Sequence, residues 1–514
     1  MHSASLRVGL CAAAGLFTLS SLSKAFAQQE SPHAVPQTQV ETHVREGDHS
    51  IQINSDGVSP ESKDFEDQLK HLFKRVEEFQ PARLVVFVHG GLVTLKEANA
   101  RADKLATEIA TEHERTYPIF VNWEAGLLTS YVRHLAFERN GISYKGTPGA
   151  GGAVLGSPLV LAADLGRGAT RLPINTTLSF AKAAQNGDWM YKANPRSFPV
   201  KNKFNETLRL LFSDHPDKTQ KDLAYFRDGL CYHPQDGGRP RVHLSLGADS
   251  HKKLRLGHFA LNAVTWPVEV VTEPILDTFG TPAWHNMLRR TRSMFHPSGN
   301  FITRNIPSVS PERPQASKNP ELGAGAIFFR QLNQFMVDHP RIRLDLIGHS
   351  MGTIVINDAY REWPNLAARN IIYMAAACSI RDFQISTGRY IDKHPGVNFY
   401  NLCLHPRAEL EETHALGTPV RGSLLVWIDE FFQSPESFGD RTLGTFENAV
   451  IAYKLLPQTP RVHLKAFPFE ADDTSQGGGV PRKHGEFTGF KFWCPSFWET
   501  TCDVTASYDR NSAR

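Results

Sequence analysis

A serine between two glycines is the part of the sequence with the clearest chemical meaning. Residues 348–352 read G-H-S-M-G, a G-x-S-x-G pattern. A β-prone apolar run at 341–347 precedes the pattern, and helical spacing of apolar residues follows it at 351–361. A tight strand-to-helix turn of this kind exposes a serine hydroxyl, and its glycines allow neighbouring backbone to pass close by. The pattern predicts that Ser350 is the nucleophile of an acyl-transfer reaction.

A second glycine-containing segment, F-V-H-G-G at 87–91, ends the first clear strand-like run. With these two segments the chain resembles the α/β-hydrolase family, in particular its lipase- and esterase-like serine hydrolases. The resemblance covers residues 83–125 and 323–490. It implies an oxyanion hole formed by two backbone N–H groups, that of Met351 and that of Gly91 or its neighbour Leu92. The segment departs from H-G-G-G, which leaves the detailed class of the hole open.

The resemblance also implies a general base late in the chain. His484 follows the last strand-like run, 462–467, and a loop with three consecutive glycines. His463 lies inside that run and is expected to be structural. His89, at the end of the first run, is expected to orient the oxyanion loop rather than to transfer protons. We therefore expect His484 to accept the proton of Ser350.

A carboxylate should complete the triad, because it fixes the imidazole tautomer and stabilises the charged ring. The family places it after the penultimate strand, and here the run at 397–404 is followed by Glu409 where the family usually has aspartate. Asp382, after the run at 370–375, is the runner-up. Three other carboxylates are read as solvated charges: Glu411, Glu412 and Asp429.

β-prone runs alternate with helical patterns in two parts of the chain. Continuous apolar strands between helices are typical of a parallel sheet covered on both faces. We expect an α/β fold of the α/β-hydrolase kind, with a mostly parallel sheet and a large inserted cap. The expected strands are 83–88, 117–123, 341–347, 370–375, 397–404 and 462–467, and the expected helices are 64–79, 95–113, 327–337, 351–361 and 383–390.

The alternation stops at 141–320, which is expected to be an insertion that forms a cap or lid within one domain built from 49–140 and 321–514. The apolar, glycine-rich run at 148–166 is either a lid or membrane-touching loop that admits lipid-like acyl chains, or a buried loop. Its proline and aspartate argue against a full span.

A helix-like piece at 283–295 lies in the same insertion. Its Trp284 and Met287 either line an acyl pocket or pack in the core. Three of its arginines are read as a solvated face: Arg289, Arg290 and Arg292.

The N-terminus has the features of a secretory signal peptide. Residues 1–27 contain a basic start, a short apolar stretch and an A-F-A site. Cleavage there would leave a polar, disordered mature N-terminus at 28–48. The alternative is a membrane anchor, for which the apolar stretch is short. We expect an exported protein, periplasmic or secreted.

Composition excludes several classes of function. The 514 residues carry 56 Lys and Arg against 53 Asp and Glu, a balance that does not suggest nucleic-acid binding. The sequence has no H-E-x-x-H pattern, phosphate-binding glycine loop or dinucleotide fingerprint, so we expect no metal and no cofactor. Cys494 and Cys502 are close enough in sequence to form a disulfide, whereas Cys378 and Cys403 are expected to be buried thiols.

These features predict an exported serine hydrolase that cleaves carboxylic esters through an acyl-enzyme on Ser350. A thioesterase, amidase or phospholipase with the same triad remains an alternative. So does a non-catalytic, hydrolase-like scaffold that binds lipids, although such a scaffold has no need of Ser350, His484 and Gly91 together.

Overall fold

The account that follows concerns the residues that the computed structural model describes. The signal peptide and polar segment expected at 1–48 lie outside them, as does Cys502. The described residues are 49–54, 57, 65–112, 115–136, 138–139, 142–143, 154–185, 231–232, 241–244, 277–296, 322–404, 408–409, 412, 422–433, 435–452, 456–457, 461–467 and 481–499.

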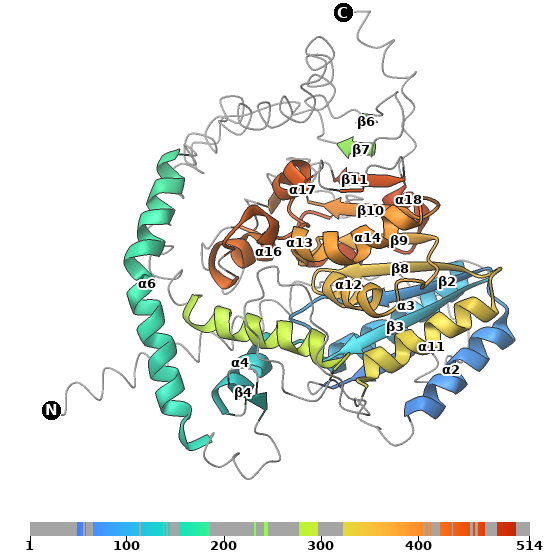
Figure 1. Cartoon of the computed structure of the whole chain (residues 1–514), viewed down its shortest axis with the longest axis horizontal. Helices are drawn as coiled ribbons and strands as arrows, with labels where there is room; N and C mark the ends of the chain where they lie inside the picture. The colour runs from blue at the N-terminus through green and yellow to red at the C-terminus, as the bar shows by residue number, and fades with distance from the viewer. Residues whose placement is uncertain are drawn as a thin grey trace, which may run out of the picture.

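A nine-stranded sheet runs through the molecule in the order β1-β3-β2-β8-β9-β10-β11-β7-β6 (Figure 1). The seven strands from β1 to β11 are parallel throughout, which confirms the predicted α/β fold. Their bounds are β1 Ser50–Ile53, β2 Arg83–Val88, β3 Thr116–Trp123, β8 Arg343–His349, β9 Asn370–Met374, β10 Asn398–Cys403 and β11 Val462–Ala466. The sequence analysis had not predicted β1, whose Ile51 and Ile53 alternate with polar residues over only four positions.

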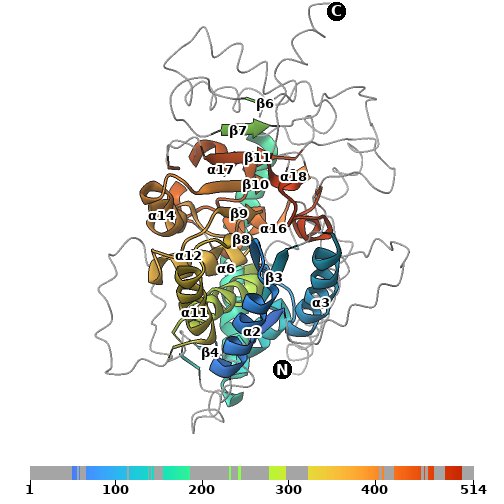
Figure 2. The ribbon, with the colours of Figure 1, turned by 90° about the vertical axis from the view of Figure 1, so that its right-hand side faces the viewer.

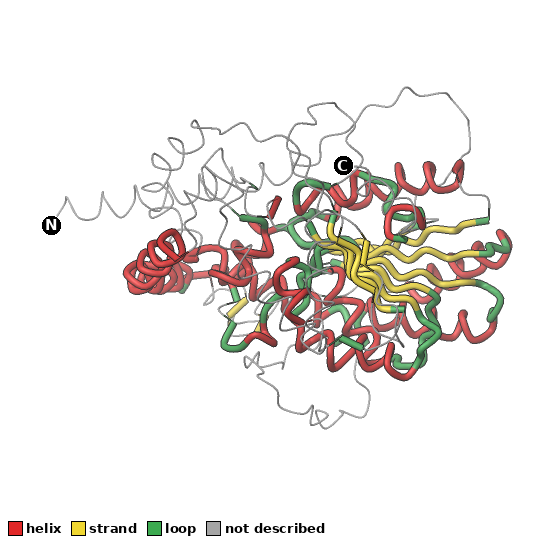
Figure 3. Tube along the Cα trace, turned by 90° about the horizontal axis from the view of Figure 1, so that it is seen from above, coloured by secondary structure: helices red, strands yellow, loops and turns green. Residues whose placement is uncertain are grey.

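Most residues of the central strands are buried because helices cover both faces of the sheet. All eight residues of β3 are buried, and so are five of the six in β2. Figure 2 shows α12 (Gly352–Glu362) and α14 (Arg389–Lys393) on one face and α3 (Leu95–Glu112) on the other. Seen from above, the strands lie between these helical layers (Figure 3). A sheet buried on both faces cannot show the polar–apolar alternation of a half-exposed strand.

Helix α2 (Phe65–Phe79) buries the face that its apolar spacing predicts. Phe73 on that face contacts Phe335 of α11 (Ala324–Asp338), with ring centroids 5.1 Å apart. The predicted helix at 383–390 has a different form. It extends over α13 (Ile380–Phe383), a π-helical segment η2 (Gln384–Gly388) and α14.

The connections of the sheet change direction at its centre. Strands β2 and β8 are neighbours, but the chain leaves β2 towards β3 on one side and leaves β8 towards β9 on the other. At such a topological switch point the loops at the carboxyl ends diverge, and open α/β sheets bind ligands there. The two glycine segments, one after β2 and one after β8, therefore meet at this switch point.

Part of the segment expected as an insertion belongs to the sheet. Strand β7 (Arg241–Leu244) pairs in parallel with β11, and β6 (Cys231–Tyr232) pairs with β7 in the antiparallel sense. A two-stranded hairpin, β4 (Glu138–Arg139) with β5 (Ile142–Ser143), lies outside the main sheet. The range 141–320 is thus more than a cap, because one of its strands extends the edge of the main sheet.

The apolar run at 148–166 is helical where it is described, not a loop, because α6 (Ser157–Gln185) begins inside it. Its Asp164 is buried and accepts hydrogen bonds from Tyr131 and His134 of α4 (Leu127–Ala136). Arg167 attaches α6 to the helix at 277–293 by donating to the backbone of that helix. Leu155 and Leu159 are 83% and 77% exposed.

Among the described helices, none combines the length and the hydropathy that a membrane span needs. Contact of the run with a membrane surface stays a prediction.

The structure also shows the burial of several side chains for which the sequence led to an expectation. Cys378 and Cys403 are buried thiols, as predicted. Arg290 is buried rather than solvated, and it donates to the hydroxyl of Ser130 and to the carbonyl oxygen of Glu124. Asp429 is half-buried rather than solvated, and it accepts hydrogen bonds from Thr442 and Asn448.

Candidate active site

Ser350 occupies the turn between β8 and α12 with a strained backbone. Its φ is +51°, a left-handed value that is rare for residues other than glycine. Its N–H donates to the carbonyl oxygen of Met374 at 2.9 Å, and its own carbonyl accepts the Thr353 hydroxyl at 2.7 Å. These contacts hold the strained turn in place. Ser350 is 1% exposed, so the hydroxyl that the sequence pattern led us to expect at the surface is covered.

Gly352 is required because the backbone of β2 passes directly beside the turn. A methyl group at this position would lie 2.1 Å from the carbonyl oxygen of Val88. Gly90 makes a similar approach, since a methyl group there would lie 2.9 Å from Cβ of Ser350. Both contacts are shorter than any side chain tolerates. The glycines therefore bring the loop after β2 against the serine.

His484 reaches Ser350 from the opposite end of the chain. It begins the 3-10 helix η6 (His484–Gly489), which follows β11 in the sequence. Its Nε2 lies 2.9 Å from the Ser350 hydroxyl oxygen, and both side chains are buried. His463, by contrast, lies within β11 and stacks on Tyr400 with ring centroids 4.5 Å apart. The geometry allows the hydroxyl to donate its proton to His484.

Two backbone N–H groups are available beside the serine. The N–H of Leu92 donates to the carbonyl oxygen of Ala125 at 2.8 Å, which leaves Gly91 as the candidate donor of the two considered in the loop. Within the part of the chain that the structure describes, neither Gly91 nor Met351 donates its backbone N–H to another group. Such paired donors beside a nucleophile can stabilise a developing oxyanion.

Met287, from the helix at 277–293, covers the loop that carries Gly91. A methyl group on Gly91 would lie 2.6 Å from Cε of Met287 and 2.6 Å from Sδ of Met351. Trp284, one turn earlier on the same helix, is also buried. A helix from the expected insertion thus forms an apolar wall beside the nucleophile, which helical spacing alone did not distinguish from core packing.

His89 holds the oxyanion loop through both of its ring nitrogens. Nδ1 donates to the carbonyl oxygen of Gly90 at 2.7 Å, and Nε2 accepts the backbone N–H of Trp123 at 3.0 Å. Burial lowers the pKa of His89 to about 4, so the ring is neutral at pH 7. Both nitrogens are engaged by backbone, which suits a residue that orients the loop.

Two buried glutamates lie on one helical turn after β10. The N–H of Glu412 donates to the carbonyl oxygen of Ala408 at 3.0 Å, so Glu409 and Glu412 share this turn. Glu409 accepts the backbone N–H of Phe446 at 3.4 Å. Both oxygens of Glu412 accept the backbone N–H of His484, at 3.0 and 3.1 Å. The expectation that Glu412 is a solvated charge is wrong, because the side chain is buried against the base.

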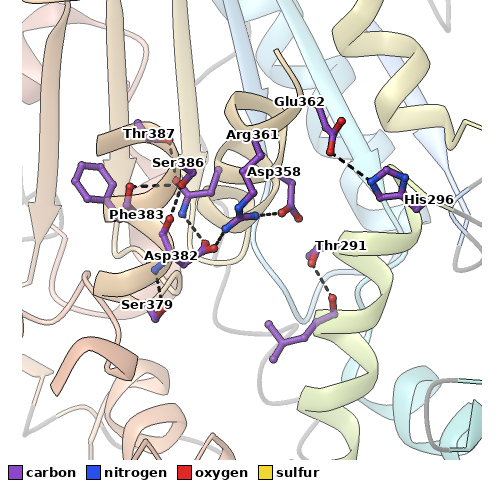
Figure 4. A network of polar contacts seen from close by, with 12 residues as sticks. Thr291, His296, Asp358, Arg361, Glu362, Ser379, Asp382, Phe383, Ser386 and Thr387 are labelled. Carbon is purple, nitrogen blue, oxygen red and sulfur yellow. Dashed lines mark hydrogen bonds and ion pairs between the residues drawn. The ribbon is translucent and has the colours of Figure 1, made fainter. Parts of the chain in front are cut away.

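Asp382, the alternative acid, is bound on another side of the fold. Its carboxylate pairs with Arg361 at the end of α12, as Figure 4 shows, and accepts a hydrogen bond from Asn357 at 2.7 Å. Arg361 also contacts Asp358, so the guanidinium lies between two carboxylates. This ion pair fixes α12 to α13 and gives Asp382 a structural partner.

Stability should fall in mild acid because of two buried histidines. Burial lowers the pKa of His349 to about 4, as it does for His89, whereas an unfolded histidine titrates near 6.5. Protons then bind the unfolded chain preferentially below pH 6.5. The free energy of unfolding is expected to decrease from pH 6.5 towards pH 4, by about 2 kcal/mol for each histidine at pH 5.

Denaturant titrations at pH 7 and pH 5 measure this decrease in the free energy of unfolding. In His349→Gln the decrease should be about 2 kcal/mol smaller than in the wild type. An equal decrease in the free energy of unfolding of His349→Gln and the wild type would contradict a lowered pKa of His349.

The fold and the site together define a class of protein. A seven-stranded parallel α/β sheet with a serine and a histidine in contact at its switch point is compatible with an α/β-hydrolase-like fold. The chain matches no protein-family model, and no curated protein or solved structure is significantly similar to it. Among the described residues, no group of three or more His, Cys, Asp or Glu side chains is arranged to hold a metal ion.

Proposed function

We propose that the chain is an exported serine hydrolase that cleaves carboxylic esters through an acyl-enzyme on Ser350. The observation that carries the proposal is the 2.9 Å contact between the Ser350 hydroxyl and Nε2 of His484, beside the N–H groups of Gly91 and Met351. A nucleophile, a base and oxyanion donors at one point are the parts that acyl transfer needs. A non-catalytic scaffold would gain nothing from a strained, buried serine paired with a histidine.

In the first half of the proposed reaction, the Ser350 oxygen attacks the ester carbonyl carbon while Nε2 of His484 takes the hydroxyl proton. The carbonyl oxygen becomes an oxyanion that accepts hydrogen bonds from the N–H groups of Gly91 and Met351. Collapse of this intermediate breaks the ester C–O bond, and the leaving alkoxide takes the proton from His484. The products are an alcohol and Ser350 acylated on Oγ.

In the second half, a water molecule takes the place of the alcohol. His484 accepts one of its protons as the water oxygen attacks the acyl carbon, and the same N–H groups stabilise the second oxyanion. When the C–O bond to Ser350 breaks, the proton returns to the serine oxygen and the carboxylic acid leaves. Loss of one oxyanion donor typically lowers the rate by about 100- to 1000-fold, so the N–H groups of Gly91 and Met351 are expected to contribute substantially to the rate.

The surroundings favour an apolar acyl group. Met287 and Met351 lie against Gly91, and Trp284 is buried one turn before Met287 on the same helix. A charged acyl chain would lose its hydration there without a partner, whereas an alkyl chain would exchange water for contact with thioether and indole groups. Thioesters and phospholipids with such chains remain alternative substrates of the same site.

A fluorophosphonate probe tests the proposal most directly. The purified protein should be labelled, and tryptic mass spectrometry should locate the adduct on Ser350. A panel of short- and long-chain p-nitrophenyl esters, with matched thioesters, amides and phospholipids, then identifies the substrate class. Absence of labelling together with absence of turnover on the whole panel would contradict a serine hydrolase.

Export is a separate part of the proposal and rests on residues 1–27. Mass spectrometry of protein recovered from the exporting cell should find a mature chain that begins at Gln28. A membrane-bound form that retains the first 27 residues would instead indicate an anchor.

A further inference from the structure

The side chain next to the nucleophile contacts the backbone of the base. His349 is the last residue of β8, and its Nε2 lies 2.9 Å from the carbonyl oxygen of His484 in a buried environment. A carbonyl oxygen can only accept, so Nε2 of His349 carries the proton and donates it. The two imidazole rings have centroids 5.2 Å apart. Ser350 thus contacts the ring of His484, and His349 contacts its main chain.

Packing leaves the His349 ring a single orientation. A methyl group on Gly90 would lie 2.9 Å from Nδ1, so this edge of the ring lies against the oxyanion loop. Phe487 lies near the ring with a centroid distance of 6.2 Å. Burial, with Arg101 and His89 nearby, lowers the pKa of His349, which keeps the ring neutral with one proton to donate. The neutral His349 ring, packed between the oxyanion loop and Phe487, is therefore a hydrogen-bond donor held in one place.

His484 is held at its amide end as well. Its N–H donates to both carboxylate oxygens of Glu412, at 3.0 and 3.1 Å, from the turn after β10. The base lies in a 3-10 helix rather than a strand, so no sheet hydrogen bonds fix its main chain. Two contacts fix it instead, one from Glu412 on the turn after β10 and one from His349 at the end of β8.

We infer that His349 is a positioning residue that keeps Nε2 of His484 within reach of the Ser350 hydroxyl. The inference rests on the proposed function and deepens it, because it adds a residue that acts through the base rather than on the substrate. A misplacement of about 1 Å in an active site can cost about 100-fold in rate. Loss of the donor should therefore slow proton transfer and leave substrate binding unchanged.

Two substitutions of His349 by amide side chains of different length test the inference. The side-chain nitrogen of His349→Gln can occupy the place of Nε2, whereas that of His349→Asn reaches only as far as Nδ1. The glutamine variant is expected to keep kcat within about threefold of the wild type, and the asparagine variant to lose about 10- to 100-fold. KM should change by less than about twofold in both. His349→Phe, which keeps a ring without a donor, should behave as the asparagine variant does.

Hydrogen exchange of the peptide that covers 481–489 provides a readout independent of activity. Exchange should be faster in His349→Asn than in His349→Gln, because only the asparagine variant releases the His484 carbonyl. Equal kcat and equal exchange in the two variants would overturn the inference. A wild-type protein that is not labelled at Ser350 would instead contradict the proposed function, and the exchange comparison would still test the contact.

Discussion

Ser350→Ala is expected to abolish fluorophosphonate labelling and to lower kcat/KM for the best ester by about 10⁴- to 10⁶-fold. The reason is that the attacking oxygen is removed, while the base, the oxyanion donors and the apolar wall remain. Residual turnover would come from a water molecule positioned by His484. Stopped or continuous assays on the ester panel measure the loss, and intact-protein mass spectrometry measures the labelling.

Folding of this variant should be nearly unchanged. The Ser350 backbone keeps its φ of +51°, and alanine bears the same backbone strain as serine. The contacts that hold the turn use backbone atoms of residue 350, not its hydroxyl. A matched control is Ser386→Ala, which removes another buried hydroxyl, in η2, and should keep labelling and turnover. Substantial ester hydrolysis by folded Ser350→Ala would refute the acyl-enzyme mechanism.

Glu409→Gln is expected to lower kcat by about 10³- to 10⁴-fold at neutral pH. The substitution keeps the shape of the side chain but removes the charge that, as we propose, stabilises the imidazolium of His484 in the transition state. KM should change little, because the carboxylate acts after the substrate has bound. Asp382→Asn is the control. Its carboxylate pairs with Arg361, so the change should lower stability and leave kcat within about tenfold.

Glu412→Gln separates the two glutamates on the turn. The amide oxygen of glutamine can still accept the His484 N–H, so kcat should fall far less than in Glu409→Gln. A collapse of kcat in Glu412→Gln with a near-normal Glu409→Gln would transfer the role of the acid to Glu412. A collapse in Asp382→Asn alone would move the acid to the helix after β9. Each outcome leaves Ser350 and His484 in place.

Local sequence was sufficient to predict the six central strands of the sheet and the turn that carries Ser350. The six predicted strands and the helices between them occur within a few residues of their expected bounds, because apolar runs of strand length and amphipathic spacing of helix length are decided by neighbours along the chain. The G-x-S-x-G pattern is likewise decided by neighbours along the chain. Its glycines are needed for a local turn, and the structure shows why in the 2.1 Å approach of Val88 to a methyl group at Gly352.

Contacts between distant segments could not be read in this way. Glu412 looked like one more charge in an acidic stretch, and its burial against His484 depends on how the turn after β10 packs against a loop 72 positions later. The same holds for Met287, which lies beside Gly91 only because the helix at 277–293 returns to the switch point. The six central strands and the strand-to-helix turn at Ser350 could be predicted from the sequence, since they follow from short-range patterns. Only the tertiary structure decided which carboxylate, which apolar wall and which neighbour of the nucleophile contact the site, because burial and hydrogen bonding between segments depend on the whole packed chain.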